Sequence, residues 1–173
     1  MGYGTTAKWF HWITVVLMAV ALPTGFVIQH IAEDHKMAFY AIHESAGLTI
    51  LIVAALRLWW KVKHPVPLDP GLPPMLRVAA NSVHHLLYVA LILQPLLGFF
   101  TTNAFGFPLR DDTAYLGFIN LPKFMEANEG LANALLAGHV WLGWTILLLL
   151  CAHIGGVIFH QAIRKDDTLL RMV

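Results

Sequence analysis

The sequence predicts an all-α integral membrane protein, a single four-transmembrane-helix bundle over residues 1–173. Three observations predict this fold. Apolar residues make up 58% of the chain and charged residues only 12%, whereas soluble domains carry about 25% charged residues. The mean hydropathy is +0.65. Four apolar stretches are each about 20 residues or longer, which is the length that crosses a bilayer. Membrane lipid is therefore the expected partner, and the net charge of +1 gives no reason to expect nucleic acid.

The predicted spans follow one another with three connections between them. The first is interpreted as a retained span because no small-residue cleavage site follows it. Pro23 and Pro95 fall inside the first and third spans, where neighbouring helices can satisfy the freed carbonyl, so kinks are expected. The second connection, 61–77, holds five prolines and is predicted to be an extended polar loop. The third, 103–130, is the longest and has room for short structure of its own. The four spans cover approximately residues 8–29, 39–60, 78–102 and 131–160.

Basic residues predict the orientation in the membrane. Seven lie at the N-terminus, in the second connection and at the C-terminus, and three lie in the other two connections. Because cytoplasmic segments are enriched in Lys and Arg, both termini are predicted to be cytoplasmic in a bacterial inner membrane. The two groups are Lys8, Lys61, Lys63, Arg77, Arg164, Lys165 and Arg171, against Lys36, Arg110 and Lys123.

Histidines in the spans carry the clearest functional signal. His139 and His153 in the last span are separated by just under four helical turns, so they share a face. We call this separation the four-turn interval. It corresponds to about 21 Å along the axis, most of the roughly 30 Å hydrocarbon core. With the predicted topology, His43 lies at the outer level of His139 and His11 at the inner level of His153. The sequence therefore predicts two histidine pairs at two depths.

Two neutral imidazoles facing each other across a bundle suit the axial positions of haem b. An ionisable group inside a bilayer is costly, which favours this interpretation over a structural one. Gly47 and Gly143 follow His43 and His139 by one helical turn, and their missing side chains leave room either for a macrocycle or for close helix packing. Arg57 follows His43 by the four-turn interval, at the inner level, where a haem propionate would satisfy its charge.

The third span contributes a further histidine. His84 and His85 are adjacent and point about 100° apart, so only one of them can face the interior. Gly98 follows His84 by the four-turn interval, and Gly25 follows His11 by the same interval. The one cysteine, Cys151, excludes an intrachain disulfide, a cysteine-bound iron–sulfur cluster and a C-x-x-C-H haem attachment.

Short motifs along nearly the whole chain have the order and spacing of one known family. They are Phe10-His11-Trp12, Ile42-His43 with Gly47, Arg57 followed by Lys63-His64-Pro65-Val66-Pro67, His84…Tyr88…Pro95…Gly98, Gly117-Phe118…Pro122, His139 with Gly143, His153, and the tail Arg164-Lys165-Asp166-Asp167-Thr168-Leu169-Leu170-Arg171-Met172. In these motifs the chain resembles the bacterial cytochrome b-561 family of four-helix, di-haem membrane proteins.

The resemblance implies two haem b groups with axial ligands from four histidines. His11 and His153 would bind the inner haem iron, and His43 and His139 the outer one. Judged by its distance to Pro95, His84 matches the further family histidine better than His85 does. The family transfers electrons between haems and the quinone pool. One type within it, similar in tail and length, is a superoxide oxidase that passes the electron of superoxide to ubiquinone.

Three hypotheses follow for the function. The first is an oxidoreductase in which superoxide, or a small periplasmic donor, reduces the outer haem and ubiquinone takes electrons from the relay. In this hypothesis His84 or Arg57 assists the quinone chemistry, and cations on the outer surface steer the superoxide anion. The second is a non-catalytic cytochrome b subunit that carries electrons for a partner dehydrogenase or periplasmic redox protein. The third, a His-lined metal transporter, is disfavoured because the spans hold little Asp, Glu or Cys.

Overall fold

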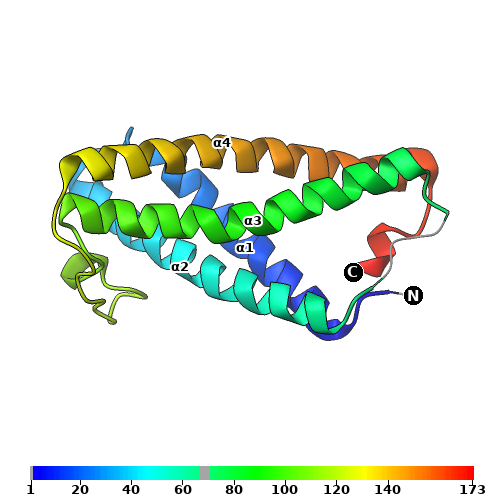
Figure 1. Ribbon diagram of the computed structural model, residues 1–173, viewed down its shortest axis with the longest axis horizontal. Coiled ribbons are helices and arrows are strands. Elements are labelled where there is room, and N and C mark those ends of the chain that lie inside the picture. The colour runs from blue at the N-terminus through cyan, green and yellow to red at the C-terminus, as the bar shows by residue number, and fades with distance from the viewer. Residues whose placement is uncertain (1, 67–70) are drawn as a thin grey trace.

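The computed structural model describes residues 2–66 and 71–173, which form a bundle of four long helices (Figure 1). Each of the four is long and apolar enough to cross a membrane, which confirms the prediction of four helices of that kind. The second and third helices run beyond the predicted limits at both ends, because polar residues continue a helix past its apolar stretch. The helices are α1 (Thr5–Val27), α2 (Glu33–Lys63), α3 (Pro74–Phe105) and α4 (Glu129–Ile158).

The helix ends follow from local residue chemistry. Pro74 opens α3, where its fixed φ suits the first turn and its missing N–H is not needed. Gly106 ends α3 with φ +88°, a left-handed conformation that glycine adopts without strain. The Asn128 side chain caps α4 by accepting a hydrogen bond from the Leu131 N–H at 3.0 Å. Residues 67–70 of the predicted proline-rich loop lie outside the described residues.

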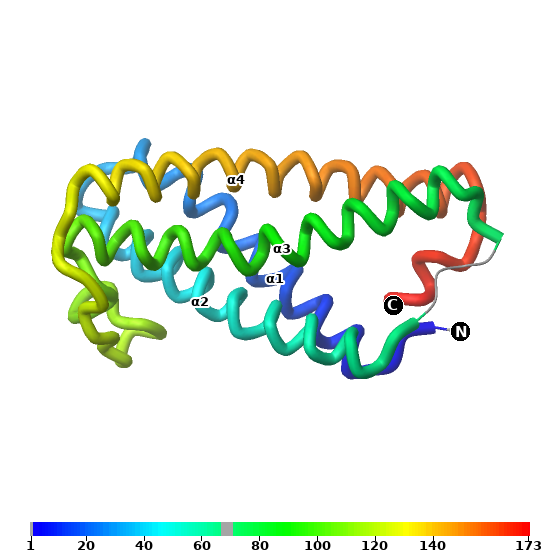
Figure 2. Tube along the Cα trace, in the orientation of Figure 1, coloured from blue at the N-terminus to red at the C-terminus, as the bar shows by residue number. Residues whose placement is uncertain are grey.

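The bundle consists of two helical hairpins that meet along one seam. α1 packs against α2, α3 packs against α4, and α2 joins the hairpins by packing against α3 (Figure 2). Among the described residues, α1 and α4 meet only at isolated points. The bundle is therefore closed on the α2–α3 side and looser on the α1–α4 side.

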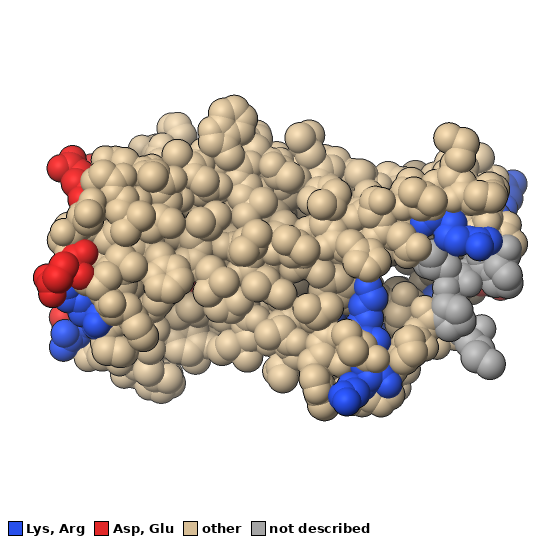
Figure 3. All heavy atoms as spheres, in the orientation of Figure 1, with Lys and Arg blue, Asp and Glu red and all other residues tan. Residues whose placement is uncertain are grey.

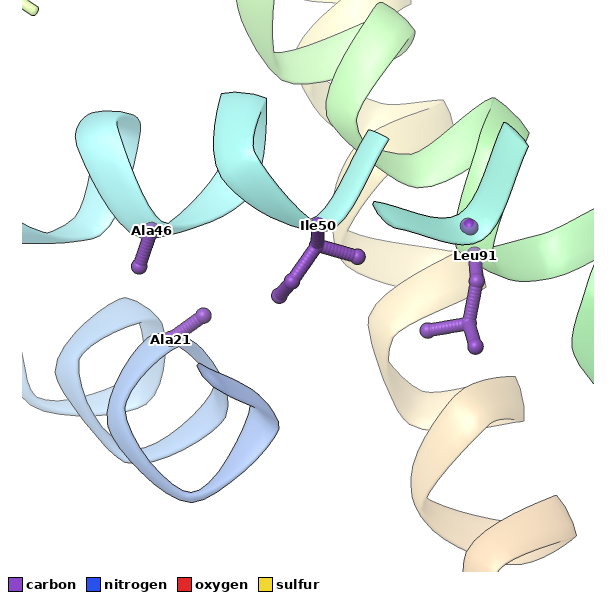
Figure 4. Packing of buried hydrophobic residues seen from close by; sticks show 5 residues of the cluster. Ala21, Ala46, Ile50 and Leu91 are labelled. Carbon is purple, nitrogen blue, oxygen red and sulfur yellow. The ribbon is translucent and has the colours of Figure 1, made fainter. Parts of the chain in front are cut away.

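Small side chains allow the close approach of α1 and α2. Ala21 of α1 faces Ala46 of α2, with Ile50 beside them (Figure 4). Leu91 of α3 completes the cluster, together with Ala54. Small residues at helix contacts are typical of membrane bundles, where packing rather than exclusion of water holds helices together. Many large apolar residues instead face outward, for example Leu148 with 71% of its surface exposed, as expected of a face that meets lipid.

The two ends of the bundle differ. At the terminal end, where both chain termini lie (Figure 1), the Tyr3 N–H donates to the Arg171 carbonyl at 3.2 Å and Trp12 Nε1 donates to the Met172 carbonyl at 3.0 Å. The loop end carries the α3–α4 connection, residues 106–128, with the 3₁₀ turn η1 (Asp111–Thr113). On the face seen in Figure 3, Asp and Glu gather at the loop end, and the terminal end is dominated by Lys and Arg around a hollow.

The α3–α4 connection is tied to the helices beneath it. The Ser45 hydroxyl of α2 accepts a hydrogen bond from the Leu116 N–H at 3.0 Å. Asn103 is fully buried, and its side-chain oxygen accepts the Phe124 N–H at 3.0 Å. A buried amide with its partners satisfied fixes a loop at little cost. The short structure expected in this connection is confirmed by η1 and by a bridge between Tyr115 and Ile119.

The C-terminal tail folds around Asp166. After the π-helical turn η2 (Phe159–Arg164), the Asp166 carboxylate accepts hydrogen bonds from Arg164 Nε at 2.8 Å, His160 Nδ1 at 2.7 Å and the Thr168 N–H at 3.1 Å. The chain then ends in the 3₁₀ turn η3 (Leu169–Arg171). Partial burial opposes ionisation of Asp166, but these donors outweigh it and hold the pKa of the carboxyl well below its usual range.

Asp166→Asn is expected to lower the melting temperature of the protein at pH 7 by a few degrees. The folded-state pKa of Asp166 is depressed, so its stabilisation is present above the unfolded pKa, about 3.9, and is lost as the pH falls below that value. Thermal unfolding in detergent at pH 7 and at lower pH should therefore show the wild type and the variant converging in acid. Asp167→Asn, at an exposed neighbour, is the control. A difference that does not change with pH would contradict this account.

Candidate functional site: two histidine pairs

Four histidines meet as two pairs at two levels of the bundle. The rings of His43 (α2) and His139 (α4) have centroids 6.0 Å apart toward the loop end. The rings of His11 (α1) and His153 (α4) have centroids 6.3 Å apart toward the terminal end. We call these the loop-end pair and the terminal-end pair. Both pairings predicted from the four-turn interval are therefore brought together by the fold.

The ring separations fit one metal ion between the members of each pair. An imidazole nitrogen binds a metal at about 2 Å, and the ring centre lies about 1 Å behind that nitrogen. Two axial imidazoles on one ion therefore have centroids about 6 Å apart. Both measured separations agree with this value.

The loop-end pair is fixed by backbone carbonyls of the neighbouring helix. His43 Nδ1 lies 2.8 Å from the carbonyl oxygen of Ala21 in α1, and His139 Nδ1 lies 3.0 Å from that of Gln94 in α3. A carbonyl oxygen only accepts, so each Nδ1 carries the proton and each Nε2 presents a lone pair. Metal-binding histidines characteristically donate their second nitrogen in this way. The chemistry of this pair therefore fits haem ligation.

Two glycines make the space that these imidazoles occupy. A Cβ added at Gly25 would lie 2.6 Å from Cε1 of His43, and one added at Gly98 would lie 2.9 Å from Cε1 of His139. In both cases the carbonyl that accepts the ring proton belongs to the residue one turn before the glycine. Each ring therefore sits in the same kind of notch, which we call the glycine notch. The sequence linked these glycines only to earlier histidines of their own helices, because contacts between helices are not visible in spacing along one helix.

Near the loop-end pair there is open space, and there are buried polar atoms without hydrogen-bond partners among the described residues. A Cβ at Gly47 would meet nothing within 4 Å, whereas one at Gly143 would lie 3.4 Å from Gln94 Nε2. The side-chain oxygen Oε1 of Gln94 and Oε2 of Glu44 are buried without a hydrogen-bond partner among the described residues. Buried polar atoms normally have partners. The open position at Gly47 is consistent with room for a macrocycle beside His43.

The terminal-end pair has a different electrostatic setting. Arg57 Nη2 lies 3.0 Å from His11 Nδ1, and because guanidinium only donates, this Nδ1 is the acceptor. The His84 ring lies 5.3 Å from the His153 ring, so a third imidazole joins this level. His85 instead donates Nδ1–H to the Asn81 carbonyl of its own helix at 2.7 Å and is exposed. The structure thus identifies His84 as the interior member of the His84-His85 dipeptide.

Two further residues at this level were missed by sequence reasoning. Tyr88 of α3 lies beneath both cations of α2, with its ring centre 5.3 Å from Arg57 Cζ and 4.6 Å from Lys61 Nζ. A cation over an aromatic face is attracted by the ring quadrupole. Lys61 follows Arg57 by one helical turn, and Tyr88 follows His84 by one turn. This spacing places each of them on the same helix face as a predicted site residue, and it was the sequence signal that could have identified them.

The predicted outer cations are largely paired. Lys36 contacts the Glu33 carboxylate, and Lys123 Nζ donates to Glu126 at 2.7 Å. The hydrogen bond from Lys123 lowers the pKa of the Glu126 carboxyl. Arg110 is exposed and belongs to none of the ion pairs found among the described residues. Steering of an anion to the loop end would therefore rest mainly on Arg110.

Comparison with known proteins identifies the family of this chain. The family model of prokaryotic cytochrome b561 matches residues 2–173. The chain belongs to the prokaryotic cytochrome b561 family. Members of this family are membrane cytochromes that bind haem b.

Three individual relatives are 26% to 28% identical to this chain. Cytochrome b561 homolog 2 of Escherichia coli (strain K12) is 28% identical over 174 residues, covering 99% of this chain and 90% of the relative. The probable superoxide oxidase CybB of Yersinia pestis is 26% identical over 165 residues, covering 94% of this chain and 90% of the relative. Cytochrome b561 homolog 1 of Escherichia coli (strain K12) is 26% identical over 174 residues, covering 99% and 96%.

Proposed function

We propose that this cytochrome b561 carries two haem b groups and transfers electrons from a donor at the loop end to ubiquinone. In this proposal the protein lies in the bacterial inner membrane with both termini in the cytoplasm, so the loop end faces outward. The distribution of basic residues supports this orientation. The observation that carries the proposal is the presence of two imidazole pairs, each with the ring separation that one metal ion requires.

The ligands follow from the pairs. His43 and His139 would hold the outer haem iron through Nε2, because both Nδ1 atoms are already committed to carbonyls. His11 and His153 would hold the inner haem iron. Ligation through Nε2 of His11 would require the proton on Nδ1, so the Arg57 guanidinium would turn from this nitrogen to a carboxylate acceptor, for which a haem propionate has the right chemistry, while staying at the terminal-end level.

The protein residues supply position and surroundings. Bound haem b with two imidazole ligands supplies one-electron chemistry without an open position for oxygen. The glycine notches hold the loop-end imidazoles in one tautomer and orientation, and the apolar helices exclude water. Ubiquinone also takes up protons when it is reduced, and His84 places an additional imidazole at the terminal end, whose ring nitrogens can donate and accept hydrogen bonds there.

Superoxide is the proposed donor. The likeness to the probable superoxide oxidase of Yersinia pestis supports this choice, together with the similarity of tail and length noted above. A one-electron donor suits a relay that accepts electrons singly. Superoxide would reach the loop end as an anion, attracted by Arg110 against the repulsion of the neighbouring Asp111 and Asp112.

The test uses the purified protein in detergent. Haem and protein contents and a reduced-minus-oxidised spectrum should give two b-type haems per chain. Stopped-flow mixing with superoxide should reduce the haems, and added ubiquinone should reoxidise them. A protein without a b-type band would contradict the whole proposal. A two-haem protein that superoxide does not reduce would instead indicate a cytochrome subunit serving another donor.

A further inference from the structure

The two hairpins share a pattern of residues. In α1, a histidine precedes a glycine by the four-turn interval. In α2, a second histidine precedes a glycine by one helical turn and precedes a further residue by the four-turn interval. The same spacings recur in α3–α4. The corresponding residues are His11 and His84, Gly25 and Gly98, His43 and His139, Gly47 and Gly143, and Arg57 and His153.

The structure supports this correspondence for the loop-end residues. His43 and His139 occupy equivalent glycine notches in their own hairpins. Only the last position differs in chemistry, because the first hairpin has Arg57 where the second has His153. The terminal end therefore holds a permanent cation at a position where the pattern of the other hairpin has an imidazole.

A second cation reinforces the charge at this position. Arg57 Nη2 is 3.0 Å from the His11 ring, and Lys61 lies one turn further along α2 over the same Tyr88 ring. None of the ion pairs among the described residues involves Arg57 or Lys61. The partners that these cations have among the described residues, an imidazole and an aromatic ring, are neutral. A haem propionate bound to Arg57 would offset part of its charge and leave that of Lys61 in place.

The loop-end pair has no comparable cation among its described hydrogen-bond partners. These partners are the Ala21 and Gln94 carbonyls, the Thr24 hydroxyl at 3.3 Å from His43 Nδ1, and the Gln94 amide at 3.3 Å from His139 Nε2. All of these are neutral dipoles. The two pairs therefore resemble each other in ring separation and differ in the charge beside them.

A fixed cation beside a redox centre favours the state with one more electron. The added electron lowers the net charge of the centre by one, and its attraction to the cation is strong in a low-dielectric interior. Arg57 and Lys61 are partly buried, and partly buried charges are screened less by salt than surface charges. A redox centre at the terminal end would thereby be easier to reduce than one at the loop end.

We propose that Arg57, reinforced by Lys61, makes the terminal-end centre the electron sink and so directs electrons from the loop end to the terminal end. This inference rests on the proposed function, since it needs haem at both pairs. One electron leaves the loop-end iron, which is oxidised, and reaches the terminal-end iron, which is reduced. No bond is made or broken, and Arg57 stays protonated throughout. Arg57 is therefore a positioning residue that acts through charge.

The experiment is a redox titration of the purified two-haem protein, followed in the α-band of the spectrum. His139→Ala, which retains only the terminal-end haem, assigns the components, and that haem should be the one with the higher midpoint in the wild type. Arg57→Gln should lower this midpoint by about 59 mV, equivalent to a tenfold change in the one-electron equilibrium. Arg57→Lys retains the charge and should stay close to the wild type. Lys61→Gln should shift the same midpoint down by a smaller amount.

The outcomes separate this inference from the proposed function. An unchanged midpoint in Arg57→Gln, or an equal shift in Arg57→Lys, would overturn the role of charge while leaving a two-haem cytochrome in place. A protein without haem would overturn the proposed function instead. If Arg57→Gln does not retain the terminal-end haem, Lys61→Gln decides, since a lowered midpoint supports the inference and an unchanged one contradicts it.

Discussion

His139→Ala is expected to remove one of the two haems and leave the other in place. His139 contributes its ring only to the loop-end pair, at 6.0 Å from His43, while His153 lies almost four turns further along the same helix. Loss of one axial imidazole leaves that iron with a single protein ligand, so the haem content per chain should halve. Haem quantification against protein concentration and a low-temperature α-band spectrum measure this directly.

The matched control is His85→Ala. This imidazole is exposed and bonds to the Asn81 carbonyl of its own helix, so its removal should leave two haems. Retention of both haems in His139→Ala would contradict the ligand assignment. Loss of both would indicate that the bundle depends on the loop-end haem for its fold, and circular dichroism of the variant would show the lost helicity.

Gly25→Ala is expected to disable the loop-end site without touching a ligand. The new Cβ would lie 2.6 Å from Cε1 of His43, so the ring has to leave the notch and give up its hydrogen bond to the Ala21 carbonyl. Overpacking of this kind costs about 1–3 kcal/mol, and the lost hydrogen bond about 1 kcal/mol more. We expect a lower melting temperature and weaker retention of one haem during purification.

Gly155→Ala is the control for this prediction, because a Cβ at Gly155 meets nothing within 4 Å. It should keep both haems, and alanine also favours the helix slightly. Gly98→Ala should resemble Gly25→Ala, since its Cβ would lie 2.9 Å from Cε1 of His139. If Gly25→Ala and Gly155→Ala behaved alike in haem content and melting temperature, the glycine notch would have no part in placing the ligand.

Sequence alone predicted the spans and the histidine pairs because both depend on a few fixed lengths. Helix rise and bilayer thickness place His139 and His153 at two depths without knowledge of any neighbour. The helix ends were harder to predict from the sequence, because hydropathy marks only the part of a helix that meets lipid. α2 begins at Glu33 and ends at Lys63, both charged residues beyond the apolar stretch.

Contacts between helices could not be predicted in the same way. The fit of His43 against Gly25 depends on how α1 and α2 are rotated about their axes, which no interval within one helix reveals. The resemblance favoured His84 over His85, but which of the two faces the interior depends on the rotation of α3, which only the structure shows. Lys61 was assigned only to the count of basic residues, because its contact with Tyr88 needs the α2–α3 seam.

The glycine notches have a consequence for the biogenesis of the protein. Each loop-end imidazole is anchored by a carbonyl of its own hairpin, so α1–α2 and α3–α4 can each orient a ligand as soon as their two helices have inserted. Membrane helices generally form before they associate. Haem would then arrive last and join two halves whose ligands are already aimed, which keeps the entropic cost of its capture small.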